Sequence, residues 1–230
     1  MAFEVYMSGR PVRGVLFDMD GVILDTEKLY SRFWREAAVA LGYPMTHDQA
    51  LRMRSLNRTA GQAMLEQFFG PGISHPRVRA KRIELMDAYV KECGVEPKPG
   101  AAQILAYLKE RRIPAAISTS SPRQRVEDYL GPLGLLEGFT RICSAYDVPK
   151  GKPEPDIYLY GAASLALRPE DCLAVEDSPA GVRSAFRAGC MTVMVPDQDP
   201  PTDEVMPMLF AKADSLMDLI GLIEARRCDV

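Results

Sequence analysis

Short apolar runs alternate with amphipathic segments along most of this chain. Each run ends abruptly at polar or turn-forming residues, which is typical of a buried strand that leads into a loop. The runs lie at 12–17, 113–119, 173–175 and 191–195, with a weaker candidate at 139–143. The amphipathic segments lie at 101–111, 153–165 and 179–188 and predict helices. A strand followed by a helix, repeated several times, predicts an α/β fold with a parallel sheet covered on both faces.

The segment from residue 26 to residue 95 departs from this alternation, because its apolar residues follow a helical period only. One apolar stripe consists of Leu29, Tyr30, Phe33, Trp34, Ala37, Ala38 and Leu41. The segment begins beside Asp25 and ends at a Pro- and Gly-containing stretch, 96–100, both suitable as hinges. We therefore predict two domains: a core formed by 1–25 and 96–230, and an all-helical domain at 26–95 inserted after the first strand.

Composition narrows the class of partner. The 230 residues carry 28 basic and 31 acidic side chains, a formal net charge of -3, which provides no broad positive field for nucleic acid or an anionic membrane. No apolar run reaches the roughly 18 residues that span a bilayer, and the first residues lack the apolar segment of a signal peptide. The five cysteines are odd in number and form no CxxC pair, which predicts reduced thiols and a cytoplasmic protein. We expect a monomer that acts on a small molecule.

Polar side chains follow the apolar runs at four places. They are Asp18 with Asp20, Thr119 with Ser120 and Ser121, Lys152, and Glu176 with Asp177. Any one of them alone is most simply a turn former, a helix cap or a solvated charge. Together they bring four carboxylates to the carboxyl edge of a parallel sheet, where ligands bind in such folds. The mutual repulsion of these carboxylates requires nearby cations, which Mg²⁺ and Lys152 would supply.

The spacing of Asp18 and Asp20 indicates the chemistry of this edge. Side chains two residues apart in an extended strand point the same way, so both carboxylates would face one substrate atom. One carboxylate can attack phosphorus to form an aspartyl-phosphate, while the other carries protons for the leaving group and for water. A hydroxyl such as Thr119, an ammonium such as Lys152 and Mg²⁺ are the remaining parts that phosphoryl transfer requires.

Four ordered motifs also give the chain a family resemblance. They are Asp18-Met19-Asp20-Gly21-Val22, Ile117-Ser118-Thr119-Ser120-Ser121, Gly151-Lys152-Pro153-Glu154-Pro155-Asp156 and Glu176-Asp177-Ser178-Pro179-Ala180-Gly181. They resemble the motifs of the haloacid dehalogenase superfamily, and most closely those of its β-phosphoglucomutase-like phosphatase branch. The resemblance implies a Rossmann-like three-layer core, an inserted helical cap domain and Mg²⁺-dependent phosphoryl transfer. The presence of Asp20 favours transfer to or from an oxygen over dehalogenation.

The resemblance implies a role for each residue at a matching position. Asp18 is the implied nucleophile and Asp20 the implied general acid and base. Thr119, Ser120 and Lys152 are implied to bind phosphate. The implied metal-binding residues are Asp18, Asp20 through its backbone carbonyl, Glu176 and Asp177.

Two residues of the predicted helical domain are candidates for substrate contact. Arg58 lies near the position of an arginine that contacts substrate phosphate in the mutase-like branch. Tyr30 occupies the position where the mutase has a histidine, and a tyrosine, with its ordinary pKa of about 10, cannot replace an imidazole as a proton carrier near neutral pH. A phosphatase acting on a small, sugar-phosphate-like metabolite through an aspartyl-phosphate is therefore favoured. A β-phosphoglucomutase-type isomerase and a non-catalytic phosphometabolite-binding module are the alternatives.

Overall fold

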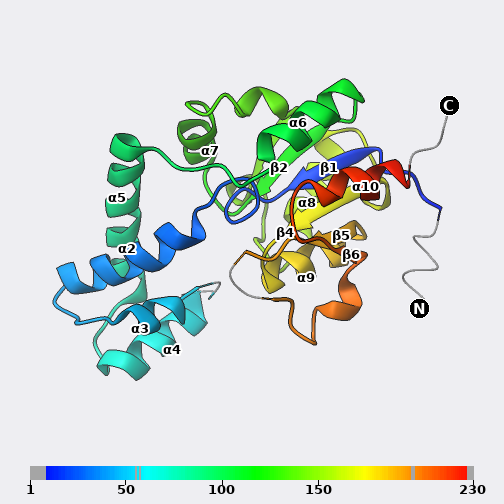
Figure 1. Ribbon diagram of the computed structural model, residues 1–230. Helices are drawn as coiled ribbons and strands as arrows, with labels where there is room; N and C mark the ends of the chain where they lie inside the picture. The colour runs from blue at the N-terminus through cyan, green and yellow to red at the C-terminus, as the bar shows by residue number, and fades with distance from the viewer. Residues whose placement is uncertain (1–8, 55, 57, 198–199, 227–230) are drawn as a thin grey trace. The chain divides into compact units, whose positions relative to one another are not determined.

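A computed structural model describes residues 9–54, 56, 58–197 and 200–226 of the chain. Within these residues, six parallel strands form one sheet in the order β3-β2-β1-β4-β5-β6 (Figure 1). The strands are β1 Gly14–Phe17, β2 Ala115–Thr119, β3 Arg141–Ser144, β4 Cys172–Glu176, β5 Met191–Met194 and β6 Ala211–Lys212. The predicted α/β fold with a parallel sheet is confirmed.

The central strands are apolar because both of their faces are covered. Every residue of β1, β2, β4 and β5 is buried, which explains why these strands appear in the sequence as continuous apolar runs. Strand β1 lies between β2 and β4, so the chain order reverses direction at β1. In open parallel sheets, such a reversal places a ligand site at the carboxyl ends of the strands.

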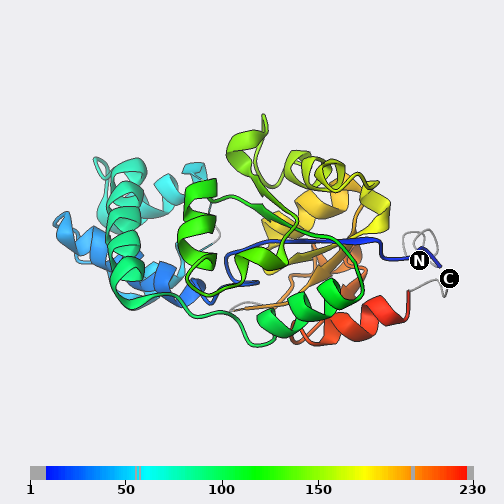
Figure 2. The ribbon, with the colours of Figure 1, turned by 90° about the horizontal axis from the view of Figure 1, so that it is seen from above.

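Helices of the same unit cover the sheet in two layers. They are α6 Ala101–Glu110, α7 Arg123–Leu130, α8 Asp156–Ser164, α9 Pro179–Ala188 and α10 Asp218–Glu224. Short 3-10 helices lie at Leu136–Gly138, Ala145–Asp147, Pro169–Asp171 and Met206–Met208. Helices α6 and α10 lie side by side on one face of the sheet, and α8 and α9 lie on the other (Figure 2). The core beneath α8 and α9 includes Leu16, Ala116 and Ala174 from three adjacent strands.

Local sequence sets the bounds of α9. The hydroxyl of Ser178 accepts a hydrogen bond from the backbone N–H of Gly181 at 3.2 Å and so caps the helix start. Pro179 is the first helical residue, a position whose N–H has no partner within the helix. Gly189 ends the helix at φ 88°, a left-handed conformation that favours glycine. The helix therefore begins directly after the end of β4.

Residues 25–95 form a separate, all-helical unit. Its helices are α2 Glu27–Ala40, α3 His47–Leu51, α4 Arg58–Phe69 and α5 His75–Cys93. Helix α2 packs against α5, and a core within the unit gathers apolar side chains that include Trp34, Leu65 and Val78. This unit has its own hydrophobic core, separate from the core of the sheet.

The two chain segments that lead into and out of the helical unit pair with each other. Leu24 forms an isolated antiparallel bridge with Pro97, and the backbone N–H of Lys98 donates to the carbonyl of Ile23 at 2.8 Å. The Lys98 ammonium also forms an ion pair of 2.7 Å with Asp197, which follows β5. Contacts divide the chain directly after Leu24, so that residue 25, which we assigned to the core from the sequence, lies in the helical unit.

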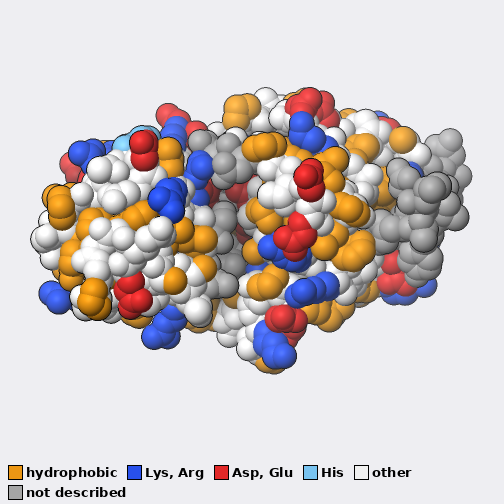
Figure 3. Space-filling model, turned by 90° about the horizontal axis from the view of Figure 1, so that it is seen from below, with side chains coloured by type: hydrophobic (Ala, Val, Ile, Leu, Met, Phe, Trp, Pro, Cys, Tyr) orange, Lys and Arg blue, Asp and Glu red, His pale blue; other side chains and the backbone are white. Residues whose placement is uncertain are grey.

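The described cysteines carry free thiols. Cys143, Cys172 and Cys190 are buried and Cys93 is exposed, whereas Cys228 lies outside the described residues. Among the helices in the described part of the chain, none is long and apolar enough to cross a membrane. On the face shown in Figure 3, acidic and basic side chains are interspersed over each unit.

Candidate active site

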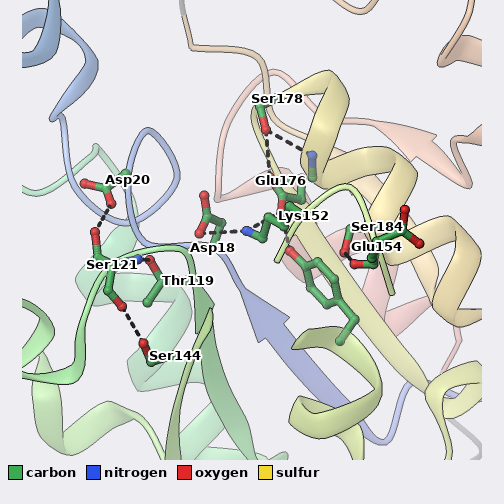
Figure 4. A network of polar contacts seen from close by, with 12 residues as sticks. Asp18, Asp20, Thr119, Ser121, Ser144, Lys152, Glu154, Glu176, Ser178 and Ser184 are labelled. Carbon is green, nitrogen blue, oxygen red and sulfur yellow. Dashed lines mark hydrogen bonds and ion pairs between the residues drawn. The ribbon is translucent and has the colours of Figure 1, made fainter. Parts of the chain in front are cut away.

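Three adjacent strands end at one edge of the sheet and bring predicted site residues together. Thr119 and Glu176 are the last residues of β2 and β4, and Asp18 directly follows β1. In the sheet, Phe17 of β1 is in register with Ile117 of β2 and Val175 of β4. The side chains of these three site residues therefore lie at neighbouring carboxyl ends (Figure 4).

The alternation of side chains along the strands directs Asp18 and Glu176 to the same face. Leu16 and Ala174, two residues earlier on β1 and β4, belong to the core beneath α8 and α9. Lys152 reaches this face from the loop that precedes α8. Its Nζ lies 2.9 Å from Asp18 Oδ1 and 2.6 Å from Glu176 Oε1. One ammonium thus links carboxylates from two strands.

Burial and charge shift the acidity of this cluster. Only 12% of the Asp18 side chain and 7% of the Lys152 side chain are exposed. Burial raises the pKa of Asp18 to about 7; the Lys152 ammonium opposes this rise, whereas Glu176 and Asp20 add to it. Burial disfavours the Lys152 ammonium, but the carboxylates of Asp18 and Glu176 outweigh burial and raise its pKa above the ordinary value. Lys152 therefore stays charged, and Asp18 changes charge near neutral pH unless a further cation is present.

Asp20 is held from the side of β2. The Ser121 hydroxyl donates a hydrogen bond of 3.0 Å to Asp20 Oδ2, and the Ser121 N–H donates to Thr119 Oγ1 at 3.0 Å. Ser144, at the end of β3, donates to the carbonyl of Ser121 at 2.8 Å (Figure 4). Asp20 Oδ1 is buried and has no hydrogen-bond partner among the described residues. One oxygen of Asp20 is thus fixed, and the other is left for a ligand.

Two local expectations differ from the structure. Strand β1 ends at Phe17, and Gly21, at φ 77°, turns the chain directly after Asp20. Asp20 therefore lies outside β1, where it forms an isolated parallel bridge with Leu24 across this turn. Ser121, which alone suits a helix cap, donates instead to Asp20, and Pro122 precedes α7 without a side-chain cap. The contact of Ser121 does not follow from local sequence, because it depends on how the turn after β1 approaches the end of β2.

Three acidic side chains are close enough to share a cation. One carboxylate oxygen from each of Asp18, Glu176 and Asp177 lies within 4.8 Å of the other two. Mg²⁺ prefers carboxylate and carbonyl oxygens and keeps coordination positions for water or phosphate. Burial, and to a lesser extent the charges of Glu176 and Asp20, raise the pKa of Asp18, so a cation bound here would favour its ionised form. The residues present therefore fit a magnesium ion.

The Glu176 carboxylate is held on several sides. Its Oε1 accepts a hydrogen bond of 2.5 Å from the Tyr158 hydroxyl, and the Ser178 hydroxyl lies 3.4 Å from Oε2. A Cβ at Gly181 would lie 1.9 Å from the carboxyl carbon, so the carboxylate fills the space that a side chain would need. Burial, followed by the charge of Glu176, raises the pKa of Tyr158 well above its ordinary value, so its hydroxyl keeps its proton. Tyr158 lies outside the four motifs, so the sequence did not predict it as a site residue. The one feature of the sequence that could have indicated it is its position six residues after Lys152.

The remaining predicted residues are Ser120, Arg58 and Tyr30. Ser120 follows Thr119 at the same edge and is exposed. Arg58 is the exposed first residue of α4, and Tyr30 lies on α2 with the Arg82 guanidinium 4.5 Å from its ring centroid. Arg58 and Tyr30 belong to the helical unit, whereas Asp18, Lys152 and Glu176 belong to the unit that contains the sheet. Their contact with a substrate stays a prediction.

Known proteins resemble this chain over most of its length. The family described as haloacid dehalogenase-like hydrolase matches residues 15–195, a range that includes all four motifs. Hexitol phosphatase A from Escherichia coli is 35% identical over 199 residues, which cover 84% of this chain and 88% of that protein. Beta-phosphoglucomutase from Bacillus subtilis is 30% identical over 197 residues, which cover 82% of this chain and 85% of that protein.

A solved structure shares the same architecture. CbbY from Rhodobacter sphaeroides, determined in complex with phosphate, has a TM-score of 0.74 and 26% sequence identity, with 90% of this chain and 96% of that chain covered. The predicted fold, the predicted family and the predicted class of enzyme, a hydrolase, are confirmed. The cluster of Asp18, Lys152, Glu176 and Asp177 at the strand ends and the matched motifs lead to one conclusion: the chain belongs to the haloacid dehalogenase-like hydrolase family.

Proposed function

We propose that this hydrolase is a Mg²⁺-dependent phosphatase that releases inorganic phosphate from a small phosphorylated carbohydrate. The observation that carries the proposal is the contact between Asp18 and the Lys152 ammonium at the carboxyl edge of the sheet, beside further carboxylates. A carboxylate held beside fixed positive charge can attack phosphorus while the charge of the phosphate is neutralised. The similarity to a hexitol phosphatase and to a β-phosphoglucomutase supports a carbohydrate as the phosphorylated substrate.

In the first step, a carboxylate oxygen of Asp18 attacks phosphorus. A bond forms between this oxygen and phosphorus as the ester bond between phosphorus and the leaving oxygen breaks. The leaving alkoxide takes a proton from Asp20, whose Oδ2 is held by Ser121 and whose Oδ1 is open to a ligand. Lys152 and Thr119 bind the phosphate oxygens during the transfer. The product of this step is an aspartyl-phosphate and a free alcohol.

In the second step, Asp20 is a carboxylate and takes a proton from water as the water oxygen attacks phosphorus. The bond between phosphorus and Asp18 breaks, which releases inorganic phosphate and restores both aspartates. Asp18, Glu176, Asp177 and the backbone carbonyl of Asp20 would hold Mg²⁺. When bound, the ion supplies positive charge that favours the ionised form of Asp18 and offsets the charge of the phosphate.

The substitution Asp18→Asn tests the nucleophile. An amide cannot form the aspartyl-phosphate, so we expect phosphate release to fall by about 10³-fold or more. Release is measured with Mg²⁺ on a panel of sugar phosphates, hexitol phosphates, phosphoglycolate and nucleotides. Asp128→Asn, at an exposed position on α7, is the matched control and should keep full activity. Full turnover in the Asp18 variant, or undiminished turnover in EDTA, would contradict the mechanism.

An isomerase of the β-phosphoglucomutase type is the second candidate, favoured by the similarity to the enzyme from Bacillus subtilis. It requires the aspartyl-phosphate to survive until a sugar hydroxyl attacks it. Tyr30, at the position where the mutase has a histidine, counts against this candidate. Incubation with β-glucose 1-phosphate separates the two, because a phosphatase yields free phosphate and a mutase yields glucose 6-phosphate. Tight binding of phosphometabolites without turnover of any would instead indicate a binding module.

We also infer a monomeric enzyme of the cytoplasm. Free thiols at Cys143, Cys172 and Cys190 support a reducing compartment, where cysteines remain unpaired. Cell fractionation tests the location, and size-exclusion chromatography tests the monomer.

A further inference from the structure

Tyr158 is a buried polar residue outside the four motifs. It lies in the first turn of α8, and its side chain has no exposed surface. A hydroxyl in such a place costs free energy unless it has a hydrogen-bond partner. Because a phenylalanine would fill the same space without this cost, the hydroxyl needs an explanation beyond packing.

The partner of this hydroxyl is Glu176. Tyr158 donates to Glu176 Oε1 at 2.5 Å, and Lys152 Nζ lies 2.6 Å from the same oxygen. Lys152 Nζ also lies 5.3 Å from the centroid of the Tyr158 ring, within the range of a cation–π contact. Among the described residues, Oε2 has only the long contact of 3.4 Å with Ser178. Two donors therefore bind Oε1, whereas Oε2 accepts only this one long hydrogen bond among the described residues.

The backbone of α9 restricts the carboxylate from the other side. Gly181 approaches Glu176 so closely that a Cβ would lie 2.0 Å from either carboxylate oxygen. Glu176 is fully buried, so no water shell can replace a lost hydrogen bond on its surface. The orientation of the carboxylate is thus determined by Tyr158, Lys152 and the start of α9 together.

We propose that Tyr158 is a positioning residue for the magnesium site, because its hydroxyl holds Oε1 of Glu176 and so leaves Oε2 for the cation. The inference rests on the proposed Mg²⁺-dependent function. Residues that orient a metal ligand without touching the metal typically change metal affinity by 10- to 100-fold when they are replaced. Removal of the Tyr158 hydroxyl should therefore weaken Mg²⁺ binding more than it weakens the fold.

The test is Tyr158→Phe in the full chain, which keeps the ring and removes the hydroxyl. Mg²⁺ binding is measured by titration calorimetry after removal of divalent cations with EDTA and dialysis. We expect the dissociation constant for Mg²⁺ to rise about tenfold or more. The Mg²⁺ concentration that gives half-maximal phosphate release should rise in the same proportion, while kcat at saturating Mg²⁺ changes little.

Two further variants separate positioning from packing. Tyr160→Phe removes a hydroxyl from the same helix at a side chain that is 41% exposed, and it should leave Mg²⁺ affinity unchanged. Replacement of Tyr158 by 4-aminophenylalanine restores a donor on the same ring and should recover part of the lost affinity. A purely structural role would lower the melting temperature in EDTA in the Phe variant without any change in Mg²⁺ affinity.

The outcomes also distinguish this inference from the proposed function. If the wild type releases phosphate with Mg²⁺ and Tyr158→Phe binds Mg²⁺ as tightly as the wild type, the positioning role is wrong and the phosphatase function stands. If the wild type binds no Mg²⁺, both are wrong. If the Phe variant does not fold, the 4-aminophenylalanine variant decides: Mg²⁺ affinity that is weakened but still measurable in a folded protein supports the role, and affinity equal to that of the wild type despite the altered donor overturns it.

Discussion

Asp18 contacts the ammonium of Lys152, whereas Asp20 accepts a hydrogen bond from the neutral hydroxyl of Ser121. One aspartate thus faces a charged group and the other a neutral one. At the scale of the residue, this difference in neighbours is consistent with the separate roles of nucleophile and proton carrier that we propose for the two aspartates.

The substitution Asp20→Asn should affect the first step according to the leaving group. An alkoxide needs a proton as it leaves, so we expect the rate of aspartyl-phosphate formation from a sugar phosphate to fall by about 10²- to 10⁴-fold. An aryl phosphate such as 4-nitrophenyl phosphate has a stable leaving group and should lose much less. Rapid-mixing measurement of the first turnover separates this step from the later attack by water. Equal losses for both substrates would argue against Asp20 as the acid.

The raised pKa of Asp18 predicts a pH dependence of stability in the absence of divalent cations. The folded protein holds the Asp18 proton more tightly than the unfolded chain does, because the pKa rises to about 7 from its ordinary value near 4. The stabilisation is therefore complete below about pH 4 and is lost as the pH rises through about 7. Urea unfolding in EDTA should show the wild type losing stability relative to Asp18→Asn over this range, and Mg²⁺ should reduce the loss. A difference that does not vary with pH would refute the assignment.

Some contacts of the site follow from the sequence and others do not. Asp18, Thr119 and Glu176 each lie at the end of an apolar run, so strand prediction alone brings them to one edge. The contacts of Ser121 and Tyr158 depend on the turn after β1 and on the rotation of α8 about its axis. Tertiary packing fixes both of these, and no local pattern records them.

At the scale of the element, the approach of α9 to the end of β4 depends on a missing side chain. Gly181 lies in the first turn of α9, where Glu176 occupies the volume of a Cβ. The capping hydroxyl of Ser178 and the first helical residue, Pro179, fix where this turn begins. The first turn of α9 and the end of β4 thus pack directly against each other around the Glu176 carboxylate.

The substitution Gly181→Ala should therefore destabilise the fold and weaken Mg²⁺ binding. Overpacking of this kind costs about 1–3 kcal/mol or more, since the backbone or Glu176 must move. Gly221→Ala on α10 is the matched control, because among the described residues no atom beyond its chain neighbours and its own helix backbone lies within 4 Å of the new Cβ. It should stabilise the helix by up to about 1 kcal/mol. Thermal unfolding and Mg²⁺ titration of both variants check the prediction, and equal behaviour of the two would exclude the steric explanation.

The sequence predicts the long, buried elements better than the short, exposed ones. Strands β1, β2, β4 and β5 are apolar throughout because both faces are covered, whereas β6 has only two residues and shows no pattern. The predicted helix at 153–165 begins later, at Asp156, because Pro155 immediately precedes the first turn. Helix α7, which is largely polar, and helix α10, which has seven residues, were not predicted.

At the scale of the whole molecule, the acidic cluster belongs to one of the two units. Asp18, Glu176 and Asp177 all lie in the unit that contains the sheet, and none lies in the helical unit. A ligand that binds only the folded form stabilises the part of the molecule that contains its site. The two units should therefore respond differently to Mg²⁺.

Saturation with Mg²⁺ should raise the melting temperature of the sheet unit. A free concentration 100 times the dissociation constant adds about 2.7 kcal/mol, or roughly 5–10 °C for a protein of this size. If the two units unfold in separate transitions in a calorimeter, only the transition of the sheet unit should move, and EDTA should reverse the shift. Asp177→Asn should reduce it. A shift of equal size in both transitions would show that the metal does not act through this cluster.

The bridge between Leu24 and Pro97 brings together the two chain segments that lead into and out of the helical unit. The helical unit is therefore an insertion whose two ends are adjacent. Backbone contacts within the sheet-containing unit, including the hydrogen bond from Lys98 to Ile23, hold these two segments together. Pairing of the strands therefore does not depend on the residues of the helical unit. A module with adjacent ends can be exchanged at such a seam without disturbing its host. Replacement of the helical unit by a different insertion between Leu24 and Pro97 should therefore leave the sheet and its strand-end residues folded.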